Sequence, residues 1–280
     1  GDRQIVEAIC DHPGIAAVSF VGSTPVARSV YARAAASGKR ALGMGGAKNH
    51  LVVLPDADVE LTAENVTESA IGCAGQRCMA AASLVAVGEV DHIIERVCER
   101  ASEVVVGEDL GAVISAAARD RIVGCIDEAE AAGARVIVDG RGATVEGCEG
   151  GYYVGATVID GVTPEMAISH TEVFGPVLSV IPFDDEDEAI QIANGTEFGL
   201  AAGVWTRDIC RGHRMAENLK AGTVWLNMYR AMAFNSPFGG YKQSGIGRQN
   251  GIEAMDAYLQ TKSVWCELSD EVQNPFIMRS

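Results

Sequence analysis

The chain alternates short apolar, often β-branched runs with longer segments of helical character, and this alternation constrains its fold more than any other feature. The apolar runs include "IAAVSFV" (15–21), "LVVL" (51–54), "SLVAV" (83–87) and "PVLSVIPF" (176–183). After the first run, a Gly-Ser-Thr turn leads to Pro25, which opens a helix that Gly38 closes. Strands that alternate with helices form a parallel or mixed sheet with helices on both faces. The sequence therefore predicts an α/β fold.

The same pattern continues to the end of the chain. Helices are expected from "PDAD" (55–58) toward 72, over 90–103 and over 184–195, and a helix followed by a buried strand is expected over 116–138. The acidic run "DDEDE" is interpreted as the solvent-exposed start of the helix over 184–195. Strands follow at "GLAAGVWT" (199–206) and "GTVWLN" (222–227), and a helix between them reaches residue 219. The second of these is expected to be an inner strand that ends at Asn227.

A glycine-rich loop, "SPFGGYKQSGIGRQNG" (236–251), precedes a further helix and a last strand, "KSVWCEL" (262–268). Its five glycines indicate backbone that closely approaches another group, because glycine alone adds no side chain at such a contact. A flexible surface connection is the alternative interpretation.

The composition of the chain argues against two classes of partner, membranes and nucleic acids. It has 280 residues, 48% of them hydrophobic, and no apolar run approaches the roughly 20 residues that cross a bilayer. The formal net charge of −16 argues against nucleic acid, because phosphate binding needs a basic surface. We therefore expect a cytoplasmic protein that binds neither membranes nor nucleic acid.

Eight scattered cysteines without paired or metal-binding spacing predict reduced thiols and no metal site. Cys78, in "GQRCMA" (75–80), differs from the others because it follows a fixed positive charge. A cysteine in a core gains nothing from a neighbouring guanidinium, whereas a nucleophilic thiolate is stabilised by it. Arg77 and local backbone dipoles are expected to lower the pKa of Cys78, at about 1.36 kcal/mol for each unit. Cys73 is expected to be a small core residue.

Six stretches together resemble the aldehyde dehydrogenase superfamily. They are "FVGST" (20–24), "GGAKNH" (45–50), "GQRCMA" (75–80), "EVFGPV" (172–177), "FGLAAGVWT" (198–206) and "PFGGYKQSGIGR" (237–248), in the order of the family. The resemblance implies an aldehyde-dehydrogenase-like fold with a partial nucleotide-binding domain. Its divisions would be the end of the dinucleotide-binding domain at 1–44, a catalytic domain at 45–245, and a C-terminal helix, oligomerisation strand and tail at 246–280.

The resemblance also implies roles for individual residues in NAD-dependent aldehyde oxidation. Cys78 would be the catalytic nucleophile. Gly22 and Ser23 would lie at the pyrophosphate of NAD, Glu172 would hold the hydroxyls of the nicotinamide ribose, and Phe174 would pack near the nicotinamide ring. A helix N-terminus after the turn at Gly22 favours an anion on physical grounds as well.

One position bears on how the acyl group leaves Cys78. Hydrolytic members of the family carry a glutamate four residues before the lysine that corresponds to Lys48, and here that position is Met44. A thioether is no general base near neutral pH. Members without the glutamate typically pass the acyl group to coenzyme A, and "GGAKNHLVVLPDAD" with "GQRCMA" looks like the methylmalonate-semialdehyde dehydrogenase branch. We therefore expect acyl transfer to CoA from methylmalonate or malonate semialdehyde, with Arg77 either at the substrate carboxylate or only packing.

Two other interpretations remain open. The chain is a hydrolytic aldehyde dehydrogenase that recruits a base from elsewhere, or a catalytically incomplete relative that serves as an oligomerising domain. The edge offered by 262–268 would pair with another subunit as it does in the family, so we expect a homo-oligomer. Asn49 is expected to make ordinary turn hydrogen bonds, with orientation of active-site backbone as the alternative, and His50 and His170 are expected to be polar packing or surface residues.

The resemblance places the start of the chain at the last β–α unit of the family's nucleotide-binding domain. Because one β–α turn supplies only part of a dinucleotide site, we expect this chain to bind NAD weakly. Isothermal titration calorimetry measures this affinity directly, and a micromolar Kd would contradict the expectation.

Overall fold

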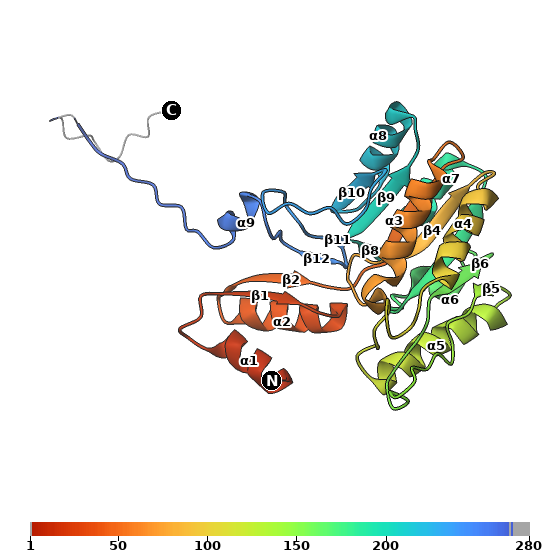
Figure 1. Cartoon of the computed structure of the whole chain (residues 1–280). Coiled ribbons are helices and arrows are strands. Elements are labelled where there is room, and N and C mark those ends of the chain that lie inside the picture. Colours follow the sequence, from red (N-terminus) through yellow and green to blue (C-terminus); the bar gives the residue numbers. More distant parts are fainter. Residues whose placement is uncertain (1, 269, 271–280) are drawn as a thin grey trace.

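A computed structural model describes residues 2–268 and 270 of the protein, and within them the strands form sheets of seven, three and two strands. A seven-stranded sheet carries helices on both of its faces. A small sheet with helices α1 and α2 lies beside it, and the end of the described chain extends away from both (Figure 1). The predicted α/β architecture is confirmed.

The helices are α1 (Arg3–Asp11), α2 (Thr24–Ala36), α3 (Val59–Ile71), the 3₁₀ turn η1 (Gly72–Gly75), α4 (Asp91–Ser102), α5 (Ala116–Ala131), α6 (Ala167–His170), α7 (Glu186–Asn194), α8 (Ile209–Asn218) and α9 (Glu253–Asp256). The strands are β1 (Ala17–Val21), β2 (Arg40–Met44), β3 (Asn49–Val53), β4 (Ala81–Val87), β5 (Arg135–Val138), β6 (Thr157–Asp160), β7 (Val177–Phe183), β8 (Phe198–Gly199), β9 (Ala201–Trp205), β10 (Thr223–Leu226), β11 (Tyr241–Lys242) and β12 (Gly245–Ile246). Within the described residues, none of the helices has both the length and the apolar composition of a membrane crossing.

The large sheet has the strand order β10-β9-β3-β4-β7-β6-β5. Its neighbouring strands are parallel except for β5, which runs antiparallel to β6. Parallel strands share one direction, so the segments that lead into β3, β4 and β7 reach the same edge of the sheet. That edge holds the candidate site.

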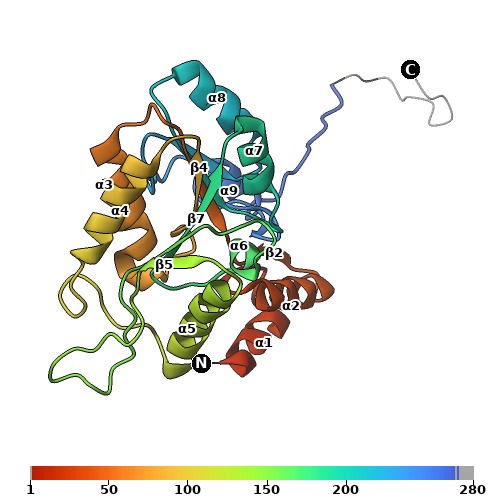
Figure 2. The ribbon, with the colours of Figure 1, turned by 90° about the vertical axis from the view of Figure 1, so that its right-hand side faces the viewer.

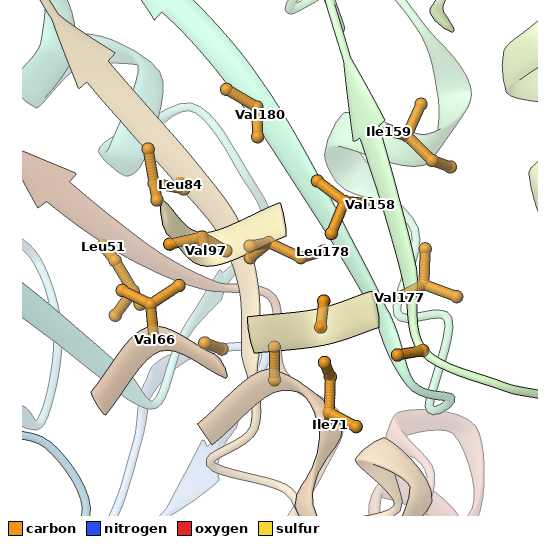
Figure 3. Packing of buried hydrophobic residues seen from close by; sticks show 14 of the residues in the cluster. Leu51, Val66, Ile71, Leu84, Val97, Val158, Ile159, Val177, Leu178 and Val180 are labelled. Atoms are coloured by element: carbon orange, nitrogen blue, oxygen red, sulfur yellow. The ribbon is translucent and has the colours of Figure 1, made fainter. Parts of the chain in front are cut away.

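The inner strand β3 is buried on both faces of the sheet. Leu51 and Leu84 belong to the core beneath α3 and α4, where Figure 3 shows them near Val66 and Val97. Val52 belongs to the separate core beneath α7 and α8, because successive side chains of a strand point to opposite faces. Figure 2 shows the two helix pairs on opposite sides of β4 and β7. Each fully buried aliphatic side chain contributes about 1.5–3 kcal/mol, so this strand anchors both layers.

The small sheet joins the first part of the chain to the glycine-rich loop. β1 and β2 are parallel, and α1 and α2 pack with them around a core that contains Cys10, Val30 and Ala34. β12 then returns from the glycine-rich loop and pairs antiparallel with β2, which places Gly245 opposite Met44. The unit formed by the first 44 residues is therefore held by chain from near the C-terminus.

The glycine-rich loop 236–251 makes the close contacts that its composition predicts. A Cβ at Gly245 would lie 2.5 Å from the carbonyl oxygen of Gly43, and one at Gly240 would overlap Ser244. Ser244 is buried, and its Oγ accepts a hydrogen bond of 3.0 Å from the N–H of Gly199. The interpretation of this loop as a flexible surface connection is wrong.

Three strand predictions need correction. β5, expected to be buried, is an edge strand with alternating exposure, and β10, expected to be an inner strand, is the opposite edge. Residues 262–268 form no strand in the described chain, and the helix before them is the single turn α9. Local apolar pattern does not encode the order in which strands pair, and an extended segment without a neighbour makes no ladder.

Gly222, at the entry to β10, tests how tightly the glycine-rich loop is packed. A Cβ there would overlap the carbonyl oxygen of Gly239, whereas a Cβ at Gly111 meets nothing within 4 Å. Gly222→Ala is therefore expected to lower the free energy of unfolding by about 1–3 kcal/mol in urea titrations, as overpacking does. Gly111→Ala is the matched control and should leave the unfolding midpoint within the range of ordinary surface changes. Equal midpoints for the two variants would contradict the packing.

Candidate functional site

A narrow cavity lies where the chain enters β3, β4 and β7. Segments distant in the sequence line it: Ala47, Asn49, Gly75, Arg77, Cys78, Ala80, Ala81, Ala82, Glu172, Val173, Phe174, Gly175 and Val177. It therefore brings together Cys78, Arg77, Glu172 and Phe174, four of the residues singled out in the sequence. Gly22 and Ser23 lie apart from it, at the junction of β1 and α2.

The segment that carries Cys78 has an uncommon backbone. Cys73 and Ala74 have φ values of 58° and 52°, in the left-handed region that side chains other than glycine rarely adopt. Gly75 follows with φ of 64°, and a Cβ there would overlap the backbone of Gly175. This turn brings the segment that carries Cys78 against the segment that carries Phe174. Cys73 itself is exposed, so its assignment to the core is wrong.

Cys78 is half-buried, and its pKa is raised. Burial is the main cause, since it disfavours the charged thiolate, and the carboxylate of Glu172 adds to it. The backbone N–H groups of Met79 and of Cys78 itself act in the opposite direction. The expectation that Arg77 lowers the pKa of this thiol is wrong, because burial raises that pKa and Nη2 of Arg77 donates its hydrogen bonds to the end of α3. All eight cysteines are free thiols, as predicted.

Arg77 caps the end of α3. Its Nη2 donates hydrogen bonds of 2.9 Å and 2.7 Å to the carbonyl oxygens of Glu68 and Gly72. Cations favour helix C-termini, where carbonyl groups lack partners within the helix. The Nε of Arg77 is buried and, within the described chain, has no hydrogen-bond partner. The side chain therefore serves packing and still leaves one donor unused beside the cavity that it lines.

Glu172 and Phe174 occupy the loop before β7. One carboxylate oxygen of Glu172 accepts a hydrogen bond of 3.1 Å from the N–H of Ala47, and a Cβ at Gly46 would lie 2.5 Å from the other. Burial raises the pKa of Glu172. Phe174 has φ of 50° and is 38% exposed at the cavity. An exposed aromatic ring on left-handed backbone is a marker of functional constraint.

Asn49 lies in β3 rather than in a turn, which corrects its predicted role. Its Nδ2 donates hydrogen bonds of 2.8 Å to the carbonyl oxygens of both Cys78 and Ala80. Its Oδ1 accepts one of 3.2 Å from the N–H of Ala201. The ladder between β3 and β4 is irregular at this point. One side chain thus joins β3, β9 and the segment before β4 next to Cys78, which agrees with the alternative role of orienting backbone at the site.

The junction of β1 and α2 holds Gly22, Ser23 and Thr24. Ser23 is the N-cap residue of α2, and within the described chain its hydroxyl makes no capping hydrogen bond. The N–H of Gly22 donates to the carbonyl oxygen of Met44 at 3.1 Å. Thr24, which the sequence analysis did not single out, accepts a hydrogen bond of 3.0 Å from the N–H of Gly46 and donates one of 3.2 Å to the carbonyl oxygen of Gln243. Its place in the "FVGST" stretch is the signal that could have identified it.

Two buried basic side chains precede and enter β3. Lys48 is 4% exposed, and burial lowers its pKa to about 8. Burial and the neighbouring charge of Lys48 lower the pKa of His50 to about 3, so this histidine is neutral in the fold. His50 is therefore a polar packing residue and His170 an exposed one, as expected.

Met44 ends β2 and is 3% exposed. It is not among the residues that line the cavity of Cys78 within the described chain, whereas Glu172 contributes a carboxylate to that lining. The position at which hydrolytic relatives carry their glutamate thus holds an apolar, buried side chain.

Residues 1–264 match the aldehyde dehydrogenase family. The chain belongs to this family. It is 40% identical over 283 residues to a betaine aldehyde dehydrogenase of Mesorhizobium japonicum, an alignment that covers 99% of the chain and 58% of the relative. The chain thus spans less than two thirds of the length of this curated relative.

Solved structures of the family have the same fold. A methylmalonate-semialdehyde dehydrogenase from Oceanimonas doudoroffii is 36% identical with a TM-score of 0.91, over 95% of this chain and 58% of that one. A betaine aldehyde dehydrogenase from Staphylococcus aureus in complex with NAD+ is 33% identical with a TM-score of 0.87, over 91% of this chain and 52% of that one. The predicted family and fold are confirmed, and NAD is bound in a structure of a relative.

The pKa of Cys78 gives a testable pH dependence. Because its folded-state pKa lies above the ordinary 9.0, alkylation by iodoacetamide should be slow at pH 7 and should rise only as the pH approaches and passes 9. Removing the nearby negative charge with Glu172→Gln should lower this pKa and speed the reaction at pH 8 severalfold. Peptide mass spectrometry measures each thiol separately.

The matched control is Glu197→Gln, which changes an exposed glutamate outside the cavity lining. It should leave the rate at Cys78 unchanged. An equal acceleration in both variants would show that Glu172 has no specific effect on the thiol.

Proposed function

We propose that this chain carries the catalytic cysteine of an NAD-dependent aldehyde dehydrogenase, and that the acyl group formed on Cys78 is passed to coenzyme A. The observation that carries the proposal is the convergence of Cys78, Glu172 and Phe174 on one cavity, although nearly a hundred residues separate the cysteine from the other two. Membership of the family supports the same chemistry.

The residues of this chain fit part of a dinucleotide site. At the N-terminus of α2, the free hydroxyl of Ser23 and the adjacent backbone suit a pyrophosphate. The Glu172 carboxylate suits ribose hydroxyls, because only one of its oxygens is engaged with backbone. The exposed ring of Phe174 suits the face of a nicotinamide. When bound, NAD supplies the acceptor for a hydride.

The reaction begins at Cys78. Its deprotonated sulfur forms a bond to the aldehyde carbon, and the carbonyl π electrons move to the oxygen. The N–H groups of Cys78 and Met79 lie at the sulfur, next to the position of this oxyanion, and would donate to it. Loss of hydride from the carbon then leaves a thioester on Cys78.

The acyl acceptor is proposed from Met44. A thioether accepts no proton near neutral pH, so the position of the family's glutamate supplies no base for water. The thiolate of coenzyme A attacks the thioester carbonyl without a strong base, and Cys78 leaves as a thiolate. Glu172 favours the alternative of hydrolysis, since its carboxylate lines the same cavity and has a raised pKa.

An anionic substrate is favoured over a cationic one. Arg77 lines the cavity with an unused, buried Nε, a charged donor suited to a carboxylate. The same guanidinium would repel the quaternary ammonium of betaine aldehyde. We therefore propose methylmalonate or malonate semialdehyde as the substrate class.

Assembly into a homo-oligomer is proposed from the end of the chain. Val264, Trp265 and Leu268 are 82%, 94% and 90% exposed in an extended segment. An exposed apolar segment in extended conformation is suited to packing against a second copy. The proposed domain limits at 44 and 245 fall where β2 ends and β12 begins.

The function is tested by incubating the chain with NAD and a semialdehyde, with and without CoA, and measuring NADH absorbance and acyl products by mass spectrometry. We expect acyl-CoA only with CoA, and no product from Cys78→Ala. Cys125→Ala is the control, because Cys125 is another half-buried thiol with a raised pKa. Free acid formed equally without CoA would favour hydrolysis, and activity retained in Cys78→Ala would overturn the assignment of the nucleophile.

A further inference from the structure

The side-chain amide of Asn49 contacts the backbone on both sides of Met79. Its two donated hydrogen bonds, each 2.8 Å, reach the carbonyl oxygens of Cys78 and Ala80. Asn49 is 2% exposed, and its carbonyl oxygen is occupied by the N–H of Ala201 in β9. A buried amide with bonds on both its nitrogen and its oxygen has a fixed orientation, because losing any of them would leave a polar group unsatisfied.

Peptide geometry connects this contact to the sulfur. The carbonyl of Cys78 and the N–H of Met79 belong to one planar peptide unit, and in a trans unit they point in opposite directions. When Asn49 holds the carbonyl oxygen on its own side, the N–H of Met79 is directed to the other side. That N–H is one of the two backbone groups that act on the sulfur of Cys78.

Other contacts hold the segment, and those made by Gln76, Arg77 and Ser69 lie outside this peptide unit. Gln76 accepts a hydrogen bond of 2.9 Å from the N–H of Ile114, and Arg77 is bound to the end of α3. Ser69 accepts one of 3.2 Å from the N–H of Ala81. The left-handed backbone at 73–75 needs such restraints, since it is strained without them. Asn49 is the contact that determines the orientation of the Cys78–Met79 peptide.

We propose that Asn49 is a positioning residue for the nucleophile: by orienting the Cys78–Met79 peptide, it aims the N–H of Met79 at the sulfur and sets the reactivity of the thiol. The inference rests on the proposed function of Cys78. It predicts that the same N–H remains aimed where the oxyanion forms, so that one amide side chain serves both the thiolate and the adduct.

The test follows alkylation of individual thiols by iodoacetamide from pH 7 to pH 10, read by peptide mass spectrometry. In Asn49→Ala, Cys78 should react roughly tenfold more slowly at pH 8 and its pH midpoint should rise by about one unit, because a backbone donor to the thiolate is lost. Asn49→Ser keeps one donor, so its alkylation rate at Cys78 should lie between those of the unchanged chain and Asn49→Ala. Cys73, exposed and five residues away, should be unchanged in every variant.

Asn194→Ala is the matched control. Asn194 also joins two backbone groups, donating to the carbonyl of Asn218 at 2.9 Å and accepting from the N–H of Lys220 at 2.7 Å, away from Cys78. It should lower the melting temperature without moving the profile of Cys78. Thermal unfolding of each variant separates a loss of stability from a change at the thiol.

A folded Asn49→Ala with the unaltered profile of Cys78 would overturn the inference. If Asn49→Ala does not fold, an unaltered pH profile of Cys78 alkylation in Asn49→Ser would overturn the inference instead. A Cys78 that resists alkylation in the unchanged chain even at pH 10 would count against the proposed function itself, and the inference would fall with it.

Discussion

Burial of β3 on both faces is the constraint on which the rest of the structure depends. A strand covered on each side by a helical layer must be apolar along its length, and its polar groups are confined to its ends. Lys48, Asn49 and His50 gather at one of those ends, buried and close together. The cavity with Cys78 lies at the same edge of the sheet. The strand β3 therefore contributes both to the apolar core, through its middle, and to the polar lining of the site, through its first residues.

The position of the cavity differs from the usual arrangement of open α/β sheets, in which ligands bind outside the carboxyl ends of the strands. Here Cys78 precedes β4 and Glu172 precedes β7, so the site lies at the amino ends. Segments that enter strands have no helix N-terminus to donate to a ligand. At this site, left-handed backbone at Cys73 and Phe174 and the hydrogen bonds donated by Asn49 determine the conformation of the segments that line the cavity.

Sequence reasoning succeeded where short-range physics decides. Apolar runs and capping residues located β1, α2, β4 and β7 closely, because burial and capping act within a few residues. It failed where the outcome depends on distant partners. The direction of Arg77 is set by the carbonyls at the end of α3, and the role of Asn49 by a loop that follows it by about thirty residues. The meeting of Cys78 with Glu172 was expected only from the resemblance to the family, since spacing alone does not encode it.

The pairing of Gly245 with Met44 has a mechanical consequence. The small sheet is connected to the large one by the chain at 45–48 and again by β12, so it has two attachments rather than one. A hinge at the first attachment alone would have to shear the hydrogen bonds of the second. Any displacement of the small sheet relative to the large one is therefore coupled to the glycine-rich loop, because that loop carries β12.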